Sequence, residues 1–283
     1  MVDGRALTRR RAGLRLWLSA IWLIALAMAA LLAPWIAPHD PLAQDLFLGR
    51  LPPFWMAGAE PGYWLGTDSL GRDVVSRILY GAQVALQVAL IAGTLTCLIG
   101  ATLGLLAGFL RGWVDVVISR MIDIWMAFPP VLFSILLIAV LGPSLTSIII
   151  AIVAIDWTRF ARVVRAEAMA QGAMDYVASA RVAGRGRIGI MLREILPNVL
   201  PTIVVLLTLE MGISVIVEAI LSFVNLSIST DDPTWGSMIA EGRAAIYQSW
   251  WVLVFPLITL FLTVLAFSQL GEGLKDRFDP VLR

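Results

Sequence analysis

Long apolar runs constrain this chain more than any other feature of its sequence. A helix needs about 20 apolar residues to cross a bilayer, and six runs of that kind cover residues 16–37, 82–109, 116–141, 145–165, 198–222 and 250–270. Hydrophobic residues make up 59% of the 283 residues and charged residues only 14%, whereas soluble domains have about 25% charged residues. The sequence therefore predicts an all-α membrane protein with six transmembrane helices.

The basic residues predict the orientation of these helices. All but four of the 21 Lys and Arg residues lie on the cytoplasmic side if the N-terminus is inside, and the four exceptions are Arg50, Arg72, Arg77 and Arg243. Cytoplasmic loops of membrane proteins carry an excess of Lys and Arg, so we expect both termini to be cytoplasmic. The expected segments are an N-tail (1–15), a transmembrane domain (16–270) with a cytoplasmic loop (166–197) and two outside segments (38–81 and 223–249), and a C-tail (271–283).

Glycine and proline refine the prediction for the second and third runs. Gly100, Gly104 and Gly108 recur every four residues and form a small-residue stripe on one helix face. We favour packing within the chain as its role over contact with another copy. Pro129 and Pro130 remove two backbone donors, so they predict a kink or break in the third run.

The end of the first outside segment has helical periodicity. Leu70, Val74, Val75, Ile78 and Leu79 recur at helical spacing, opposite a polar set formed by Arg72, Asp73, Ser76 and Arg77. This pattern predicts a short amphipathic helix lying on the outer membrane interface.

A charged island separates the fourth and fifth runs. It holds a third of the basic residues, namely Arg159, Arg162, Arg165, Arg181, Arg185, Arg187 and Arg193. Charges are costly in hydrocarbon, so the island must face the cytoplasm. Its centre is built of small residues, Ala178, Ser179, Ala180, Ala183 and Gly184, which allow another backbone to approach closely. We predict a docking element in which Ala180 and Gly184 share a helix face and Arg181 and Arg187 flank the contact.

Acidic residues inside the apolar runs are candidates for a transport pathway. Glu210, Ser214 and Glu218 recur at every fourth position and form a polar ladder on the fifth predicted helix. The ladder either lines a pathway for a polar or cationic substrate or consists of buried groups bonded to neighbouring helices. Asp123 and Asp156 are expected near the cytoplasmic ends of their helices, where solvation is easier.

Several kinds of chemistry lack the residues that they require. The chain has one Lys (Lys275), one His (His39) and one Cys (Cys97). Lys275 lies outside any Gly-x-x-x-x-Gly-Lys-Ser/Thr pattern, so the sequence predicts no nucleotide hydrolysis, no catalytic residues and no metal site. The net charge of +1 gives no indication of nucleic-acid binding.

Several segments together resemble the permease subunit of binding-protein-dependent ABC importers, and more narrowly the C-type subunit of the dipeptide, oligopeptide and nickel group. They read LAPWIAPHDPLAQDL, LGTDSLGRDVVSRILYGA, DWTRFARVVRAEAM, PTWGSMIAEGR and LGEGLKDRFDPVLR. The island is similar to the coupling loop of that family. Tyr176 to Arg181 match its Glu-Ala-Ala region, Gly184 its glycine, and Leu196 and Pro197 its Leu-Pro end. Ala178 stands where the family has Glu, and Ser179 where it has the first Ala.

The resemblance implies a fold, partners and a location. The fold would be that of a type I ABC importer permease in the bacterial inner membrane. The partners would be a second permease in a heterodimer, two cytoplasmic ATPase subunits that hold ATP and Mg, and an external solute-binding protein. The permease would carry no cofactor itself, would touch membrane lipid and no nucleic acid, and would import short peptides. Nickel or another metal chelate, or a modified peptide, is the alternative substrate.

Three other classes of protein stay open from the sequence. A secondary carrier would need repeats and midplane ion ligands, and it would leave the docking loop unexplained. An intramembrane enzyme would need His, Cys or Lys constellations that are missing. A purely structural membrane protein would have no need of an ATPase partner.

Overall fold

The computed structural model describes residues 4–226 and 232–278, and the regular secondary structure of these residues is helical. The longer helices are α1 (Gly4–Ile36), α2 (Val74–Leu110), α3 (Gly112–Met126), α4 (Pro130–Leu141), α5 (Leu145–Gln171), α8 (Leu196–Phe223) and α10 (Trp251–Phe278). The shorter elements are η1 (Leu46–Leu48), α6 (Asp175–Val182), α7 (Arg187–Ile190), the π-helical turn η2 (Met191–Ile195) and α9 (Trp235–Ala244).

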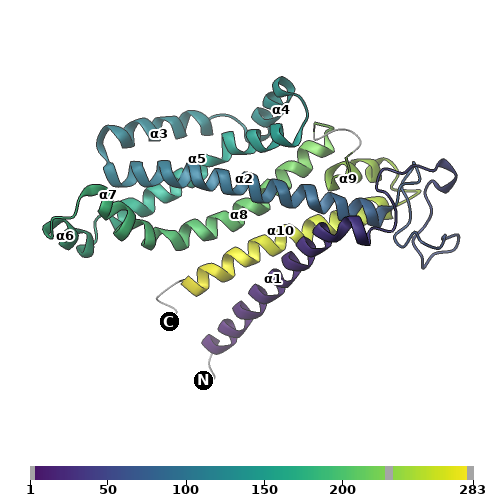
Figure 1. Cartoon of the computed structure of the whole chain (residues 1–283), viewed down its shortest axis with the longest axis horizontal. Coiled ribbons are helices and arrows are strands. Elements are labelled where there is room, and N and C mark those ends of the chain that lie inside the picture. The colour runs from purple at the N-terminus through teal and green to yellow at the C-terminus, as the bar shows by residue number, and fades with distance from the viewer. Residues whose placement is uncertain (1–3, 227–231, 279–283) are drawn as a thin grey trace.

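The helices form an elongated bundle (Figure 1). Helix α2 packs against α5 and α8, and α10 packs against α8, α9 and α1. The loop around α6 and α7 lies at one end of the bundle, and the segment between α1 and α2 lies at the opposite end together with α9. Both chain ends point away from that segment.

Each predicted apolar run corresponds to a helix or to a bent pair of helices. Among the residues that the structure describes, four spans are long and apolar enough to cross a membrane: Arg15–Ile36, Val74–Leu110, Arg187–Phe223 and Trp251–Phe278. The pair α3 and α4 would form a fifth and is bent by 85°. The predicted break at Pro129 and Pro130 is confirmed, because α4 begins at Pro130. Helix α5 carries Asp156 near its middle and Arg159, Arg162 and Arg165 in its second half, so six spans stay a prediction.

The glycine stripe of α2 packs within the chain, as predicted. A Cβ atom on Gly100 would lie 2.5 Å from the carbonyl oxygen of Trp157, and one on Gly104 would lie 2.6 Å from that of Ala161. At Gly108 it would lie 2.4 Å from the carbonyl oxygen of Arg165. The stripe therefore brings the backbones of α2 and α5 together, as small residues do in membranes.

The predicted amphipathic helix on the outer interface is wrong. Helix α2 begins at Val74 and continues to Leu110, so residues 74–81 are the first turns of a long helix. The Asp73 side chain caps it by accepting a hydrogen bond from the Ser76 amide at 2.8 Å. The polar residues of the pattern are buried, with Arg72 6% and Arg77 2% exposed. The periodicity correctly indicated a helix. It could not indicate that residues from distant parts of the chain bury the polar face of that helix.

Candidate functional site

The cytoplasmic loop of the prediction folds into a compact cap on the bundle. Helix α6 ends at Val182, and Gly184 follows it with φ +77°. The Gly184 amide donates to the carbonyl of Arg181 at 3.0 Å, and the Arg185 amide donates to that of Ala180 at 3.1 Å. This pair of bonds is a Schellman motif, in which glycine adopts the left-handed conformation at low cost. The left-handed Gly184 thus follows the end of α6 at Val182.

The small residues of this loop do not share one helix face. Tyr176 and Ala180 pack against the core around the fully buried Val177, whereas Ala178 and Ser179 are exposed. The predicted common face of Ala180 and Gly184 is wrong, because the helix ends between them. The structure instead exposes 181–188 as a continuous surface.

Tyr176 anchors α6 to the end of α5. Its hydroxyl donates to the Gln171 side chain at 2.8 Å. Burial raises the pKa of the Tyr176 phenol, so the hydroxyl keeps its proton at neutral pH. The contact holds α6 to α5.

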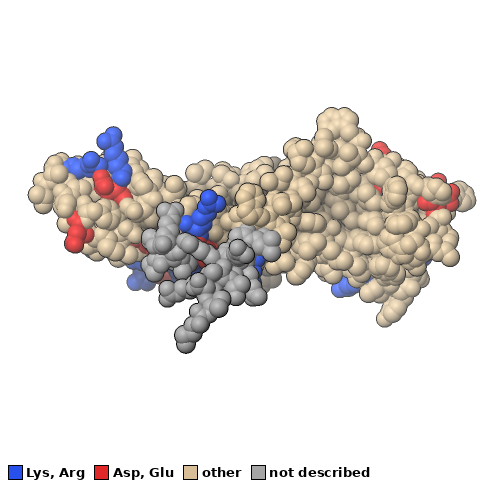
Figure 2. Space-filling view, turned by 90° about the horizontal axis from the view of Figure 1, so that it is seen from below, with Lys and Arg blue, Asp and Glu red and all other residues tan. Residues whose placement is uncertain are grey.

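The basic residues of the loop surround a hollow at this end of the molecule. Arg181, Arg185 and Arg187 line a cavity of about 360 Å³ with Phe109, Leu110 and Ile190. Figure 2 shows blue side chains gathered at the end where Figure 1 places α6 and α7. Arg185 also pairs with Glu194. Leu196 is partly buried and Pro197 exposed at the start of α8.

The predicted polar ladder lies inside the chain. Glu210, Ser214 and Glu218 are 2%, 0% and 1% exposed. Glu210 lies 3.8 Å from a guanidinium nitrogen of Arg159 on α5, and Glu218 accepts a hydrogen bond from Ser222 one turn away. Glu210 also keeps one carboxyl oxygen without a hydrogen-bond partner among the described residues.

The two aspartates of the prediction have different surroundings. Asp123 is exposed and lies 3.5 Å from Arg162, as expected for a solvated helix end. Asp156 is only 6% exposed, so the expectation of solvation is wrong for it. Its carboxylate lies 3.4 Å from Arg159, which also contacts Glu210. Arg159 is half-exposed, so it connects two buried carboxylates to the surface.

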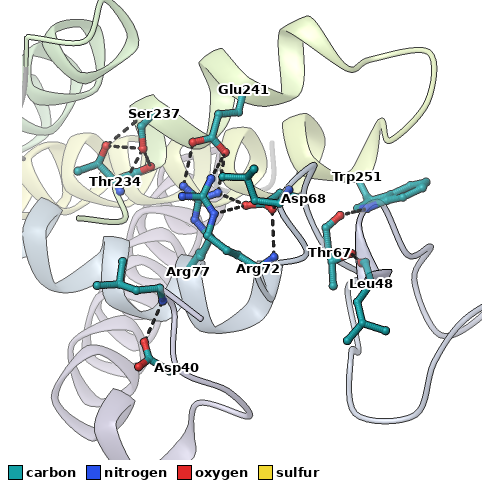
Figure 3. Close-up of polar contacts among 12 residues, drawn as sticks. Asp40, Leu48, Thr67, Asp68, Arg72, Arg77, Thr234, Ser237, Glu241 and Trp251 are labelled. Atoms are coloured by element: carbon teal, nitrogen blue, oxygen red, sulfur yellow. Dashed lines mark hydrogen bonds and ion pairs between the residues drawn. The ribbon is translucent and has the colours of Figure 1, made fainter. Parts of the chain in front are cut away.

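An ion-pair cluster that the sequence did not predict lies at the opposite end of the bundle, formed by Asp68, Arg72, Arg77 and Glu241 (Figure 3). Asp68 is fully buried and accepts a hydrogen bond from Nε of Arg72 at 2.7 Å and another from Arg77. Glu241 on α9 accepts from Arg72 at 2.9 Å and from Arg77 at 2.7 Å. Both arginines therefore join the segment before α2 to α9.

Two tryptophans strengthen the same junction. The indole of Trp251 donates to the Thr67 carbonyl at 3.0 Å (Figure 3), and that of Trp235 donates to the Ile78 carbonyl at 3.1 Å. Gly81 leaves room for Trp235, because a Cβ there would lie 2.8 Å from its ring. The concentration of charged residues between 68 and 77 was the sequence feature that indicated an electrostatic contact. Nothing in the neighbouring sequence indicated that Glu241 would be the partner of these residues.

The chain matches two family models. Residues 100–283 match the model for the binding-protein-dependent transport system inner membrane component. Residues 15–53 match the model for the N-terminal transmembrane domain of oligopeptide transport permease C.

Full-length relatives and one solved structure are similar to this chain. The di/tripeptide transport system permease protein DppC of Pseudomonas aeruginosa is 36% identical over 93% of this chain and 87% of its own. The dipeptide transport system permease protein DppC of Haemophilus influenzae is 36% identical over 93% of this chain and 89% of its own. The glutathione transport system permease protein GsiD of Escherichia coli is 40% identical over 94% of this chain and 86% of its own.

One similar solved structure is a crystal structure of an amino acid ABC transporter with histidines. It has a TM-score of 0.56 and 19% identity, and the match covers 72% of this chain and 95% of that one. At this identity the likeness concerns the fold, which is that of an ABC transporter permease.

Proposed function

Because this chain belongs to the family of binding-protein-dependent transport system inner membrane components, we propose that it forms half of the translocation pathway of an ABC importer for short peptides. The similarity to di/tripeptide, dipeptide and glutathione permeases over nine-tenths of the chain carries the proposal. These relatives favour a peptide over the nickel or metal-chelate alternative. The chain is an inner-membrane permease, a transport subunit rather than an enzyme.

The partners follow from membership of the family. A second permease would complete the pathway, and two cytoplasmic ATPase subunits would bind ATP and Mg and dock on the loop around α6. A solute-binding protein would deliver the peptide on the outer side.

The connection between the loop and the ladder supports a mechanical role for α8. The residues from Arg187 to Phe223 run as one continuous span, with α6 packed against its beginning. A displacement of α6 by an ATPase would therefore move α8 and with it Glu210, Ser214 and Glu218. ATP binding would turn the pathway outward in this mechanism, and hydrolysis would reset it inward.

Uptake into proteoliposomes tests the proposed function. The complete transporter, supplied with its binding protein and a labelled dipeptide, should accumulate peptide only when ATP is present on the ATPase side. Excess unlabelled peptide should compete, and nickel chelate should not. Uptake driven by a proton gradient without ATP would instead indicate a secondary carrier.

The proposed topology has six transmembrane helices with both termini inside. It follows from the positive-inside bias, and the placement of 38–81 and of α6 at opposite ends of the bundle supports it (Figure 1). In a Cys97→Ala background, a membrane-impermeant maleimide should label Glu60→Cys from outside intact cells and Lys275→Cys only after lysis. Labelling of both sites in intact cells would contradict the model.

We expect Glu218→Gln to lower peptide uptake about tenfold while complex yield changes less than twofold. A tenfold loss corresponds to about 1.4 kcal/mol. Loss of the carboxylate charge would weaken the binding of a cationic peptide in the pathway by a free energy of this size. Glutamine still offers an oxygen to Ser222, so a purely structural role predicts little change, or a parallel fall of yield and uptake. Normal uptake by the Glu210→Gln, Glu218→Gln double variant would exclude the pathway role.

A further inference from the structure

Aromatic rings of the segment between α1 and α2 extend onto the beginning of α10. Phe54 lies 5.0 Å from Trp55 and 6.0 Å from Trp64, between ring centroids. Trp55 lies 6.1 Å from Phe255, which in turn lies 5.9 Å from Trp250. These five residues form one aromatic cluster. Three of its rings come from the segment before α2, and two come from the beginning of α10 and the residue before it.

The part of the cluster before α2 is exposed and has almost no charge around it. The exposed fractions of Phe54, Trp55 and Trp64 are 61%, 51% and 59%. Glu60 is the one charged residue between 51 and 66. Figure 2 shows this end of the molecule as mostly uncharged surface. Exposed apolar patches of this kind mark a surface that contacts something other than water.

The position of α10 gives the depth of the cluster. The apolar span that includes α10 is Trp251–Phe278, so it begins at Trp251. Phe255 lies four residues further on, which is about 6 Å deeper at 1.5 Å per residue. Trp55 contacts Phe255, so the cluster lies beside the first turns of this apolar span.

Hydrogen bonds and a close glycine contact fix the position of the cluster relative to α10. The Phe54 amide donates to the Trp64 carbonyl at 3.1 Å, and the Thr67 carbonyl accepts from Trp251 of α10. Gly66 has φ +80°, and a Cβ there would lie 2.3 Å from the Leu51 carbonyl oxygen. These contacts tie the exposed rings to α10.

We propose that this aromatic cluster rests in the interface of the outer leaflet and anchors the segment before α2 on the membrane. Its occupant is phospholipid at the headgroup–acyl boundary, the region where tryptophan is enriched in membrane proteins. An indole suits that boundary, since its ring is apolar and its N–H bonds to polar headgroup atoms. Further along α10, Ile258 is 48% and Leu265 41% exposed, so exposed apolar side chains continue along this helix.

Spin labels in the assembled transporter, reconstituted in lipid nanodiscs, test the proposal. In a Cys97→Ala background, labels at Trp64→Cys and Met56→Cys should collide more with oxygen, which concentrates in lipid, than with a water-soluble nickel chelate. Met56 adjoins Trp55 without belonging to a ring contact, so its label keeps the test valid if Trp64→Cys fails to assemble. A label at the exposed Asp40→Cys should show the opposite preference.

Each alternative covering of the cluster gives a different result. Preferential collision with the nickel chelate at both positions would place the cluster in water and overturn the proposal. Low collision with both reagents would show that the second permease covers it and would also overturn the proposal. Adding the solute-binding protein should leave both labels unchanged, whereas protection that appears only with that protein would make the cluster its docking surface.

Discussion

Arg77→Met is expected to destabilise the end of the bundle that holds α9 by about 3–5 kcal/mol, the usual cost of removing one partner of a buried ion pair. Arg77 is 2% exposed and bonds to both Asp68 and Glu241. Methionine would leave the fully buried Asp68 with Arg72 as its remaining charged partner and would loosen the attachment of α9. The thermal midpoint of the purified transporter should fall, and amide exchange should rise in residues 65–82 and in α9.

Arg243→Met is the matched control for this prediction. Arg243 lies on the same helix as Glu241 but is exposed, with its guanidinium 5.4 Å from the Phe223 ring centre. Exposed cation–π contacts contribute about 0.5–1 kcal/mol, so this variant should change the midpoint little. Equal shifts for the two variants would show that the ion-pair cluster is not a principal support of the junction between α9 and the segment before α2.

A double variant separates the charge from the packing. Asp68→Asn with Arg77→Met removes the buried charge as well as its partner, so it should cost less than the sum of the two single changes. An additive result would mean that the two side chains stabilise the junction independently.

Features set by local chain chemistry could be predicted from the sequence. Pro129 and Pro130 break a helix because they lack amide donors, and the spacing of Gly100, Gly104 and Gly108 predicts a close helix contact. The apolar runs likewise predict the long helices, since their composition suits a bilayer. In each case the cause lies within a few residues.

Features that depend on a distant partner could not be predicted. Arg72 and Glu241 are 169 residues apart in the chain, and periodicity alone assigned Arg72 to a water-exposed face. Asp156 was expected to be solvated, but α8 brings Glu210 near it through Arg159. Periodicity gives the face on which a polar residue lies, and tertiary packing decides whether that face is buried.

The end of α6 lies between these two cases. The sequence identified Gly184 as a special position, but it predicted a residue on a helix face rather than a helix stop. The difference matters for the docking proposal. It moves the expected ATPase contact from a helix face to the exposed surface 181–188.

Gly184→Trp is expected to weaken ATPase docking by about 1–3 kcal/mol, the typical cost of overpacking a close contact. This corresponds to a fall in affinity of roughly 5- to 150-fold. Apart from Gly184 itself and its two chain neighbours, no described residue has an atom within 4 Å of a Cβ placed on Gly184, so a clash must come from a partner. Co-purification of the ATPase subunits and peptide-stimulated ATP hydrolysis should both fall, while the permease still inserts.

Two control variants distinguish a partner clash from backbone strain. Gly184→Asn keeps a residue that tolerates the left-handed conformation and adds little bulk, so it should dock almost normally. Gly142→Trp places the same ring on a glycine with φ +83° and equally open surroundings, but between α4 and α5 and outside the loop 166–197. If Gly142→Trp weakened docking as much as Gly184→Trp, or if Gly184→Trp kept full docking and stimulated hydrolysis, the loop around α6 would not be the docking element. A defect confined to Gly184→Trp would place the ATPase against this glycine, because only there would the added ring meet a neighbour.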